Sequence, residues 1–149
     1  MYRVVASPGE AEAVLDYFNG FHDGFIKRLT LVSYDYFEAR GTQVCSGGLD
    51  LELLIAHYNY RDGNPPADRV VQVRFTHVRH LHADMPGNAA EWSLLNVHFE
   101  LGTRRTAGTE EPCFQARFLQ NRLDGDRWVP YEALRFSFQE AEFREQPAG

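Results

Sequence analysis

The spacing of hydrophobic residues changes once along the chain, from a helical repeat near the start to strand-like alternation afterwards. The helical repeat puts four residues on one helix face: Ala11, Val14, Leu15 and Phe18. The segment Ser7-Pro8-Gly9-Glu10 just before it matches a capping box, with Ser7 at the N-cap and Pro8 at the first helical position. We therefore expect one helix over about residues 8–19.

From residue 25 onwards, hydrophobic residues alternate with other residues, which is typical of strands. The clearest alternating face consists of Leu49, Leu51, Leu53 and Ile55. Loops rich in Gly and Pro interrupt the pattern and leave about six strands between residues 25 and 143. Because no helical pattern separates these strands, they are expected to pair antiparallel. The predicted fold is α+β: one domain over residues 1–149, mainly antiparallel β in a twisted sheet or a sandwich, with one N-terminal helix.

Two segments support more specific expectations. Residues 25–36 carry bulky apolar side chains on both strand faces, so this strand is predicted to lie in the centre of its sheet. Residues 102–111 are polar and charged, so they are predicted to form a mobile connection between strands.

Composition limits the classes of function. With 149 residues, 44% of them hydrophobic, the chain is large enough for one domain with a substantial core. Its net charge of -6 argues against binding nucleic acid or an anionic membrane, since both require clustered cations. The sequence shows no signal peptide and no apolar run of about 20 residues, so a cytoplasmic protein is expected. Cys45 and Cys113 match neither a disulfide framework nor a zinc knuckle.

Four polar residues are candidates for a binding pocket. His22 and Asp23 follow the predicted helix, where a short link can hold a hydrogen bond between an imidazole and a carboxylate. His57 and His77 extend the apolar faces of two neighbouring strands, so they could meet His22 and Asp23 in one pocket. The alternative is that Asp23 caps a turn and that the histidines satisfy hydrogen bonds in the core.

His80-Leu81-His82 is the best candidate for a metal site. In a strand, this spacing puts both imidazoles on one face, and His98 or Asp84 could supply a third ligand for a divalent metal. The alternative is a pair of solvent-facing histidines at a strand end. No other cofactor is predicted, because the sequence contains no motif typical of nucleotide binding, zinc proteases or serine hydrolases.

Aromatic residues suggest a recognition surface. Tyr58, Tyr60 and Trp92 are the main candidates, together with the cluster Tyr34-Asp35-Tyr36-Phe37 and with Trp128. Tyrosine and tryptophan combine a large contact area with a polar group, which suits binding to another protein. The alternative is ordinary packing of these rings on a sheet. The acidic charge of the chain would suit a partner with a basic surface.

The link Phe21-His22-Asp23 followed by a hydrophobic strand resembles small uncharacterised bacterial domains rich in strands, some of them immunity-protein-like. The likeness covers about the first 60 residues. It implies a non-catalytic protein that binds another protein, often to antagonise a toxin. The sequence thus predicts a cytoplasmic protein-binding domain that uses an aromatic-rich sheet face, with a homodimer through an edge strand as a further expectation. The alternative function is a small metal- or histidine-dependent enzyme or ligand-binding domain.

Overall fold

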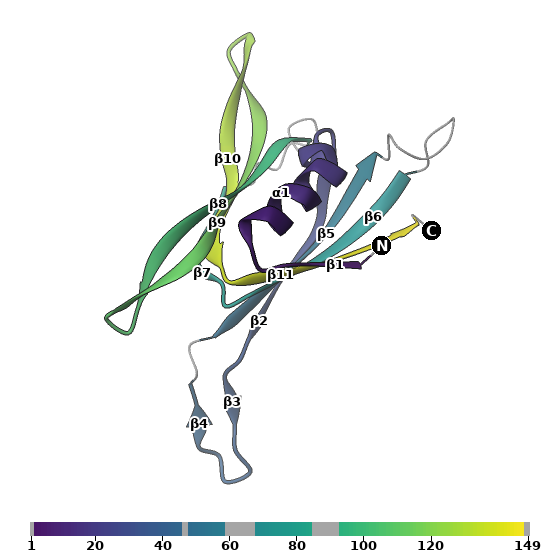
Figure 1. Ribbon diagram of the computed structural model, residues 1–149. Helices are drawn as coiled ribbons and strands as arrows, with labels where there is room; N and C mark the ends of the chain where they lie inside the picture. The colour runs from purple at the N-terminus through teal and green to yellow at the C-terminus, as the bar shows by residue number, and fades with distance from the viewer. Residues whose placement is uncertain (1, 46–47, 59–67, 85–92, 148–149) are drawn as a thin grey trace.

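The computed structural model describes residues 2–45, 48–58, 68–84 and 93–147, which form a β-sandwich with one helix (Figure 1). All strand pairs between them are antiparallel. The first sheet has five strands, in the spatial order β1 (Tyr2–Val5), β11 (Glu140–Pro147), β6 (Asp68–Thr76), β5 (Leu49–Tyr58) and β2 (Phe25–Ser33). The second sheet has four strands, in the order β7 (Arg79–Ala83), β10 (Arg127–Phe138), β9 (Thr109–Asp124) and β8 (Leu94–Thr106).

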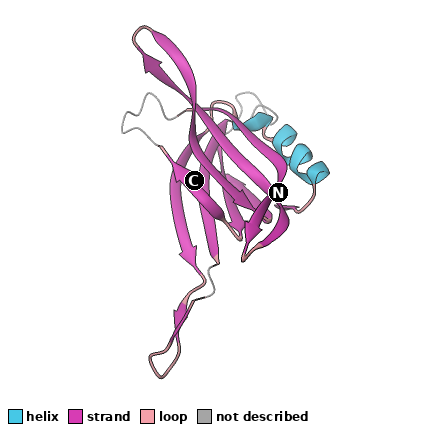
Figure 2. Ribbon diagram, turned by 90° about the vertical axis from the view of Figure 1, so that its left-hand side faces the viewer, coloured by secondary structure: helices cyan, strands magenta, loops and turns pink. Residues whose placement is uncertain are grey.

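Two strand pairs run from one sheet into the other. β6 leads into β7, and β10 leads into β11, so the pairing of β6 with β11 continues as the pairing of β7 with β10. A separate two-stranded hairpin, β3 (Tyr36–Phe37) with β4 (Gln43–Val44), follows β2. This hairpin and the β9–β10 hairpin project from opposite ends of the molecule in both views (Figures 1 and 2).

The core lies between the inner faces of the two sheets. Phe75 of β6 is fully buried, and its ring centroid lies 4.8 Å from that of Phe136 and 4.9 Å from that of Phe138. Both contacts are edge-to-face, the arrangement that aromatic quadrupoles favour. Burying a ring of this size stabilises the fold by about 1.5–3 kcal/mol. The predicted alternation is confirmed here, because Leu51, Leu53 and Ile55 are also buried.

Helix α1 (Pro8–Tyr17) and the short 3-10 helix η1 (Asn19–Phe21) pack on the five-stranded sheet. The capping box is confirmed: the amide of Glu10 donates to Ser7 Oγ (3.3 Å), and Ala6 N donates to Glu10 Oε1 (3.1 Å). Phe18 stacks on Phe143 of β11, with ring centroids 6.1 Å apart. The α-helix ends at Tyr17, slightly before the predicted end at about residue 19, and η1 begins at Asn19.

Gly20 and Gly24, which flank the link to β2, are needed for different reasons. Gly20 has φ of +62°, a conformation that glycine adopts without strain, and a Cβ there would collide with the Asn96 side chain. Gly24 is instead closely packed: a Cβ would lie 2.9 Å from Ala56 O and 3.0 Å from Phe21 O. Together they let the backbone turn closely from the helix into β2.

The structure corrects three expectations. The described residues contain eleven strands in three sheets, not about six. β2 lies at the edge of its sheet and not in the centre, and a β-bulge between Ile26 and Arg28 shifts its pairing with β5. The polar segment 102–111 is not an irregular connection: it forms the end of β8, a two-residue turn and the start of β9.

Candidate functional site

The open edge of β2 carries exposed apolar side chains. In the five-stranded sheet β2 pairs with β5 on one side, and among the described residues its other side is joined only at Phe25, by an isolated bridge to Ser93. Lys27 at the bulge and Arg28 next to it protect the first half of this edge, since charges and bulges disfavour pairing with another chain. The second half, Leu29–Ser33, has no charged residue. There, Leu31 is 48% exposed and Val32 is 42% exposed.

The hairpin that follows β2 extends the exposed apolar surface. Tyr36 and Phe37 of β3 are 56% and 72% exposed, on a hairpin that projects from the body of the sandwich (Figure 2). We call Leu31, Val32, Tyr36 and Phe37 the β2 surface. Apolar side chains scattered singly are normal on a protein surface, but these four follow one another along an edge strand and its extension. The arrangement is typical of a contact site for another polypeptide.

A buried carboxylate anchors the end of β2. The Tyr34 hydroxyl donates to Asp50 Oδ1, and Arg74 donates to Asp50 Oδ2 from Nε (2.9 Å) and Nη2 (2.7 Å). Asp50 is only 1% exposed, although it lies at the outer face of the sheet. Burial of Tyr34 and its hydrogen bond to Asp50 raise the pKa of the phenol above its ordinary value. These contacts fix the chain just before the β3–β4 hairpin begins.

His22 and Asp23 lie at the surface, in the link between η1 and β2. Their side chains are 48% and 60% exposed, and His22 Nε2 lies 3.7 Å from Asp23 Oδ1. The other ring nitrogen of His22, Nδ1, lies 2.9 Å from the Leu95 carbonyl oxygen. Asp23 has φ of +66°, and its amide donates to Leu94 O at 3.0 Å. This geometry gives the pair a clear role in joining η1 to the start of β8.

His57 lies apart from His77. His57 is 7% exposed, and its Nε2 lies 3.3 Å from Glu145 Oε1. Tyr17 of α1 donates to the other oxygen of Glu145 (2.9 Å), so this carboxylate connects the helix to the sheet. His77 follows β6 near the opposite end of β5, roughly 25 Å away by the rise of a strand. The structure therefore does not bring the two histidines into one pocket.

The proposed metal ligands also lie apart. His80 and His82 are exposed residues of β7, and His98 belongs to β8. β7 and β8 are opposite edges of the four-stranded sheet, with β10 and β9 between them. His80 has φ of +54°, which interrupts the alternation that the sequence argument assumed. Among the described residues, no group of three or more His, Cys, Asp or Glu side chains could hold a metal ion.

The aromatic candidates are only partly described. Tyr60 and Trp92 lie outside the described residues, and Tyr58 ends β5. Trp128 is 55% exposed on the β9–β10 hairpin, far from the β2 surface. Among the aromatic candidates that the structure describes, Tyr36 and Phe37 are therefore the exposed pair next to an open sheet edge.

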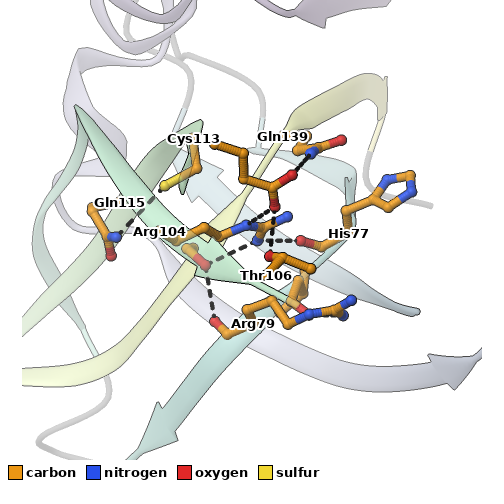
Figure 3. A network of polar contacts seen from close by, with 10 residues as sticks. His77, Arg79, Arg104, Thr106, Cys113, Gln115 and Gln139 are labelled. Carbon is orange, nitrogen blue, oxygen red and sulfur yellow. Dashed lines mark hydrogen bonds and ion pairs between the residues drawn. The ribbon is translucent and has the colours of Figure 1, made fainter. Parts of the chain in front are cut away.

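A buried arginine connects the two sheets at the far end of β8 (Figure 3). Arg104 donates to Glu111 Oε1 from Nε (2.6 Å), and from Nη1 to the His77 carbonyl (2.5 Å) and Ser137 Oγ (3.0 Å). Gln139 donates to the other Glu111 oxygen at 3.2 Å. Hydrogen bonds from Arg104 and then Thr106 lower the pKa of Glu111. Both Nε and Nη1 of Arg104 donate within the protein, which indicates a structural role.

Sequence reasoning noticed the aromatic pair in the β3 segment but missed Leu31 and Val32. The sequence feature that indicates these residues is the large apolar side chains on both strand faces of residues 25–36, which the sequence argument attributed to a central strand. The same bulk on an edge strand is exposed instead.

In the described part of the chain, no helix combines the length and apolar character needed to span a membrane. Comparison of the chain with models of protein families, with curated proteins and with solved structures finds no match.

Proposed function

We propose that this protein is a non-catalytic, cytoplasmic protein-binding domain whose partner docks on the β2 surface. The observation that carries the proposal is the exposed apolar side chains along the open edge from Leu31 to Phe37, where Asp35 is the one charged residue. An open edge strand offers unpaired backbone groups to an incoming strand, and adjacent apolar side chains supply contact area. The immunity-like role implied by the sequence resemblance, binding a toxin, belongs to this proposal.

The partner is a different protein with a basic surface. Each copy of this chain carries a net charge of -6, so two copies repel one another and a positively charged partner is attracted. The partner adds an extended segment to β2, while Tyr36 and Phe37 contact its apolar side chains. A second copy of this chain on the same edge is the competing occupant, and the experiment separates the two by mass.

Site-specific photocrosslinking in the native cells tests this proposal. A photoreactive phenylalanine analogue replaces Phe37 in one variant and Trp128, an exposed aromatic on the opposite hairpin, in the control variant. We expect an adduct at position 37 whose mass differs from that of two copies of this chain. Combining the analogue with Val32→Lys should reduce the adduct at least tenfold, while the unfolding temperature changes little because Val32 is an edge residue.

Two results would overturn the proposal. The first is an adduct at position 37 no stronger than at position 128, which would show that the β2 surface has no preferred partner. The second is an adduct with the mass of two copies, which would replace the basic partner with a homodimer.

A further inference from the structure

A groove runs between helix α1 and the edge of β8, on a different part of the molecule from the β2 surface. Its volume is about 570 Å³. One wall is the exposed side of α1, and the other is the open edge of β8, which lies next to the helix. The residues that matter below are Glu12, Leu15 and Asp16 on the helix, and Asn96, Glu100 and Leu101 on the strand.

The backbone of β8 has free hydrogen-bonding positions along this groove. β8 pairs with β9 through a two-residue turn, Ala107-Gly108, in which both residues have positive φ, so Thr106 and Thr109 exchange both backbone hydrogen bonds. Counting back along the antiparallel ladder, Val97, Phe99 and Leu101 have their N–H and C=O groups directed away from β9. The amide of Val97 indeed donates to the Asn96 side chain (2.9 Å) and not to β9. The groups of Phe99 and Leu101 are directed toward the groove.

The groove is acidic on both sides. Glu12 and Asp16 lie one helical turn apart on α1, and Glu100 lies on β8, while none of the lining residues in the described chain is a lysine or an arginine. Arg117 approaches Glu100 to 3.7 Å, but its shortest contact is with Glu132 at 2.6 Å. Three carboxylates that line one groove attract a cation.

We propose that this groove binds an extended, lysine- or arginine-rich segment of another polypeptide, which adds as a further strand to β8. Its backbone bonds the free groups of Phe99 and Leu101. Alternate side chains face either Glu12 and Asp16 on the helix or Glu100 on the outer face of the sheet. Leu15 and the 64% exposed Leu101 provide apolar contact for the stems of the long basic side chains. This inference does not depend on the β2 surface being a binding site.

Titration with designed peptides tests the inference. The probe is a fluorescent eight-residue peptide, Lys-Val-Arg-Val repeated twice, measured by fluorescence anisotropy at low salt. One control peptide replaces every basic residue with glutamate, and a second replaces two central residues with proline, which cannot donate backbone hydrogen bonds. We expect the basic peptide to bind at least tenfold more tightly than either control. Amide NMR shifts should change most at Val97, Phe99 and Leu101.

Matched variants identify the groove. The double variant Glu12→Gln/Asp16→Asn should weaken binding of the basic peptide at least tenfold, and its unfolding temperature is measured alongside to show that the variant is folded. The control Glu52→Gln/Glu142→Gln removes two carboxylates from a different surface hollow and should change binding less than twofold.

Three results would overturn the inference. One is equal binding of the proline-containing peptide, which would mean that no strand is added. Another is unchanged binding to the Glu12→Gln/Asp16→Asn variant, since the groove charges would then be irrelevant. The last is a set of NMR shifts centred on Leu31–Ser33, which would move the basic segment to the β2 surface instead.

Discussion

β2 and β8 are both edge strands, one in each sheet, but their surroundings differ. Among the described residues no strand pairs with the open side of β2 over Leu29–Ser33, and its exposed side chains there are uncharged: Thr30, Leu31, Val32 and Ser33. β8 has helix α1 beside its open side, with an acidic groove between helix and strand. The two strands therefore offer the same backbone groups in two chemical settings, one uncharged and one anionic.

The difference teaches that the neighbours of an edge strand decide what it can bind. Both strands have alternating apolar residues, and both are anchored near one end by an ion pair with one buried partner: Asp50, contacted by Tyr34 and Arg74, for β2, and Arg104, paired with Glu111, for β8. The start of β8 is also fixed, because Leu94 N donates to Gly24 O at 2.7 Å. Removing each anchor tests how far the two edges depend on them.

The largest expected effect comes from the β8 anchor. Arg104→Ala should lower the free energy of unfolding by about 3–5 kcal/mol, because it leaves polar partners in the core unsatisfied. Arg104 is 6% exposed, whereas its neighbour Arg105 has a side chain that is 75% exposed, so Arg105→Ala is the matched control and should cost at most about 0.5 kcal/mol. Chemical denaturation measures both. Equal losses in the two variants would contradict the assigned anchor.

A smaller effect is expected at the β2 anchor. Tyr34→Phe removes a hydrogen bond to a buried carboxylate that keeps Arg74 as a partner, and should cost about 1.5 kcal/mol. Amide exchange in the β3–β4 hairpin should accelerate, because its attachment to the sheet is weakened. The control Tyr36→Phe changes an exposed ring and should stay within about 0.5 kcal/mol. Unchanged hairpin exchange in Tyr34→Phe would show that Asp50 does not hold the hairpin.

The smallest effect is a pH dependence at Glu111. Its folded pKa lies below the ordinary value of 4.5, first because Arg104 donates to it. The folded carboxylate thus binds fewer protons than the unfolded one, and its stabilisation is present above pH 4.5 and is lost as the pH falls through the folded pKa. Solvent screens this partly exposed pair, so the effect should be modest.

Denaturation curves measured at several acidic pH values test this dependence. Glu111→Gln should lose less stability on acidification than the wild type, whereas the control Glu110→Gln, with a 66% exposed side chain, should follow the wild type. Parallel acid profiles for wild type and Glu111→Gln would refute the assignment.

The sequence by itself determined the local elements. The capping box at Ser7 specifies the helix start because its hydrogen bonds involve residues three or four positions apart. The alternation in β5 specifies a buried face because successive side chains of any strand point to opposite sides. The Asp-Gly turn near residue 125 follows from a glycine that accepts positive φ. Each of these depends on neighbours along the chain, so the pattern alone predicts it.

Tertiary structure alone decided which faces and edges are covered. The bulge near Lys27 puts Ile26, Leu29 and Leu31 on one face, which simple alternation divides between two. The polar segment 102–111 becomes a strand because its two halves pair with each other and need no apolar face. The groove arises because α1 packs beside β8, which brings Glu12 and Asp16 opposite Glu100 across a distance of many residues. Burial and charge at these places depend on contacts between distant segments, and a local pattern contains no information about such contacts.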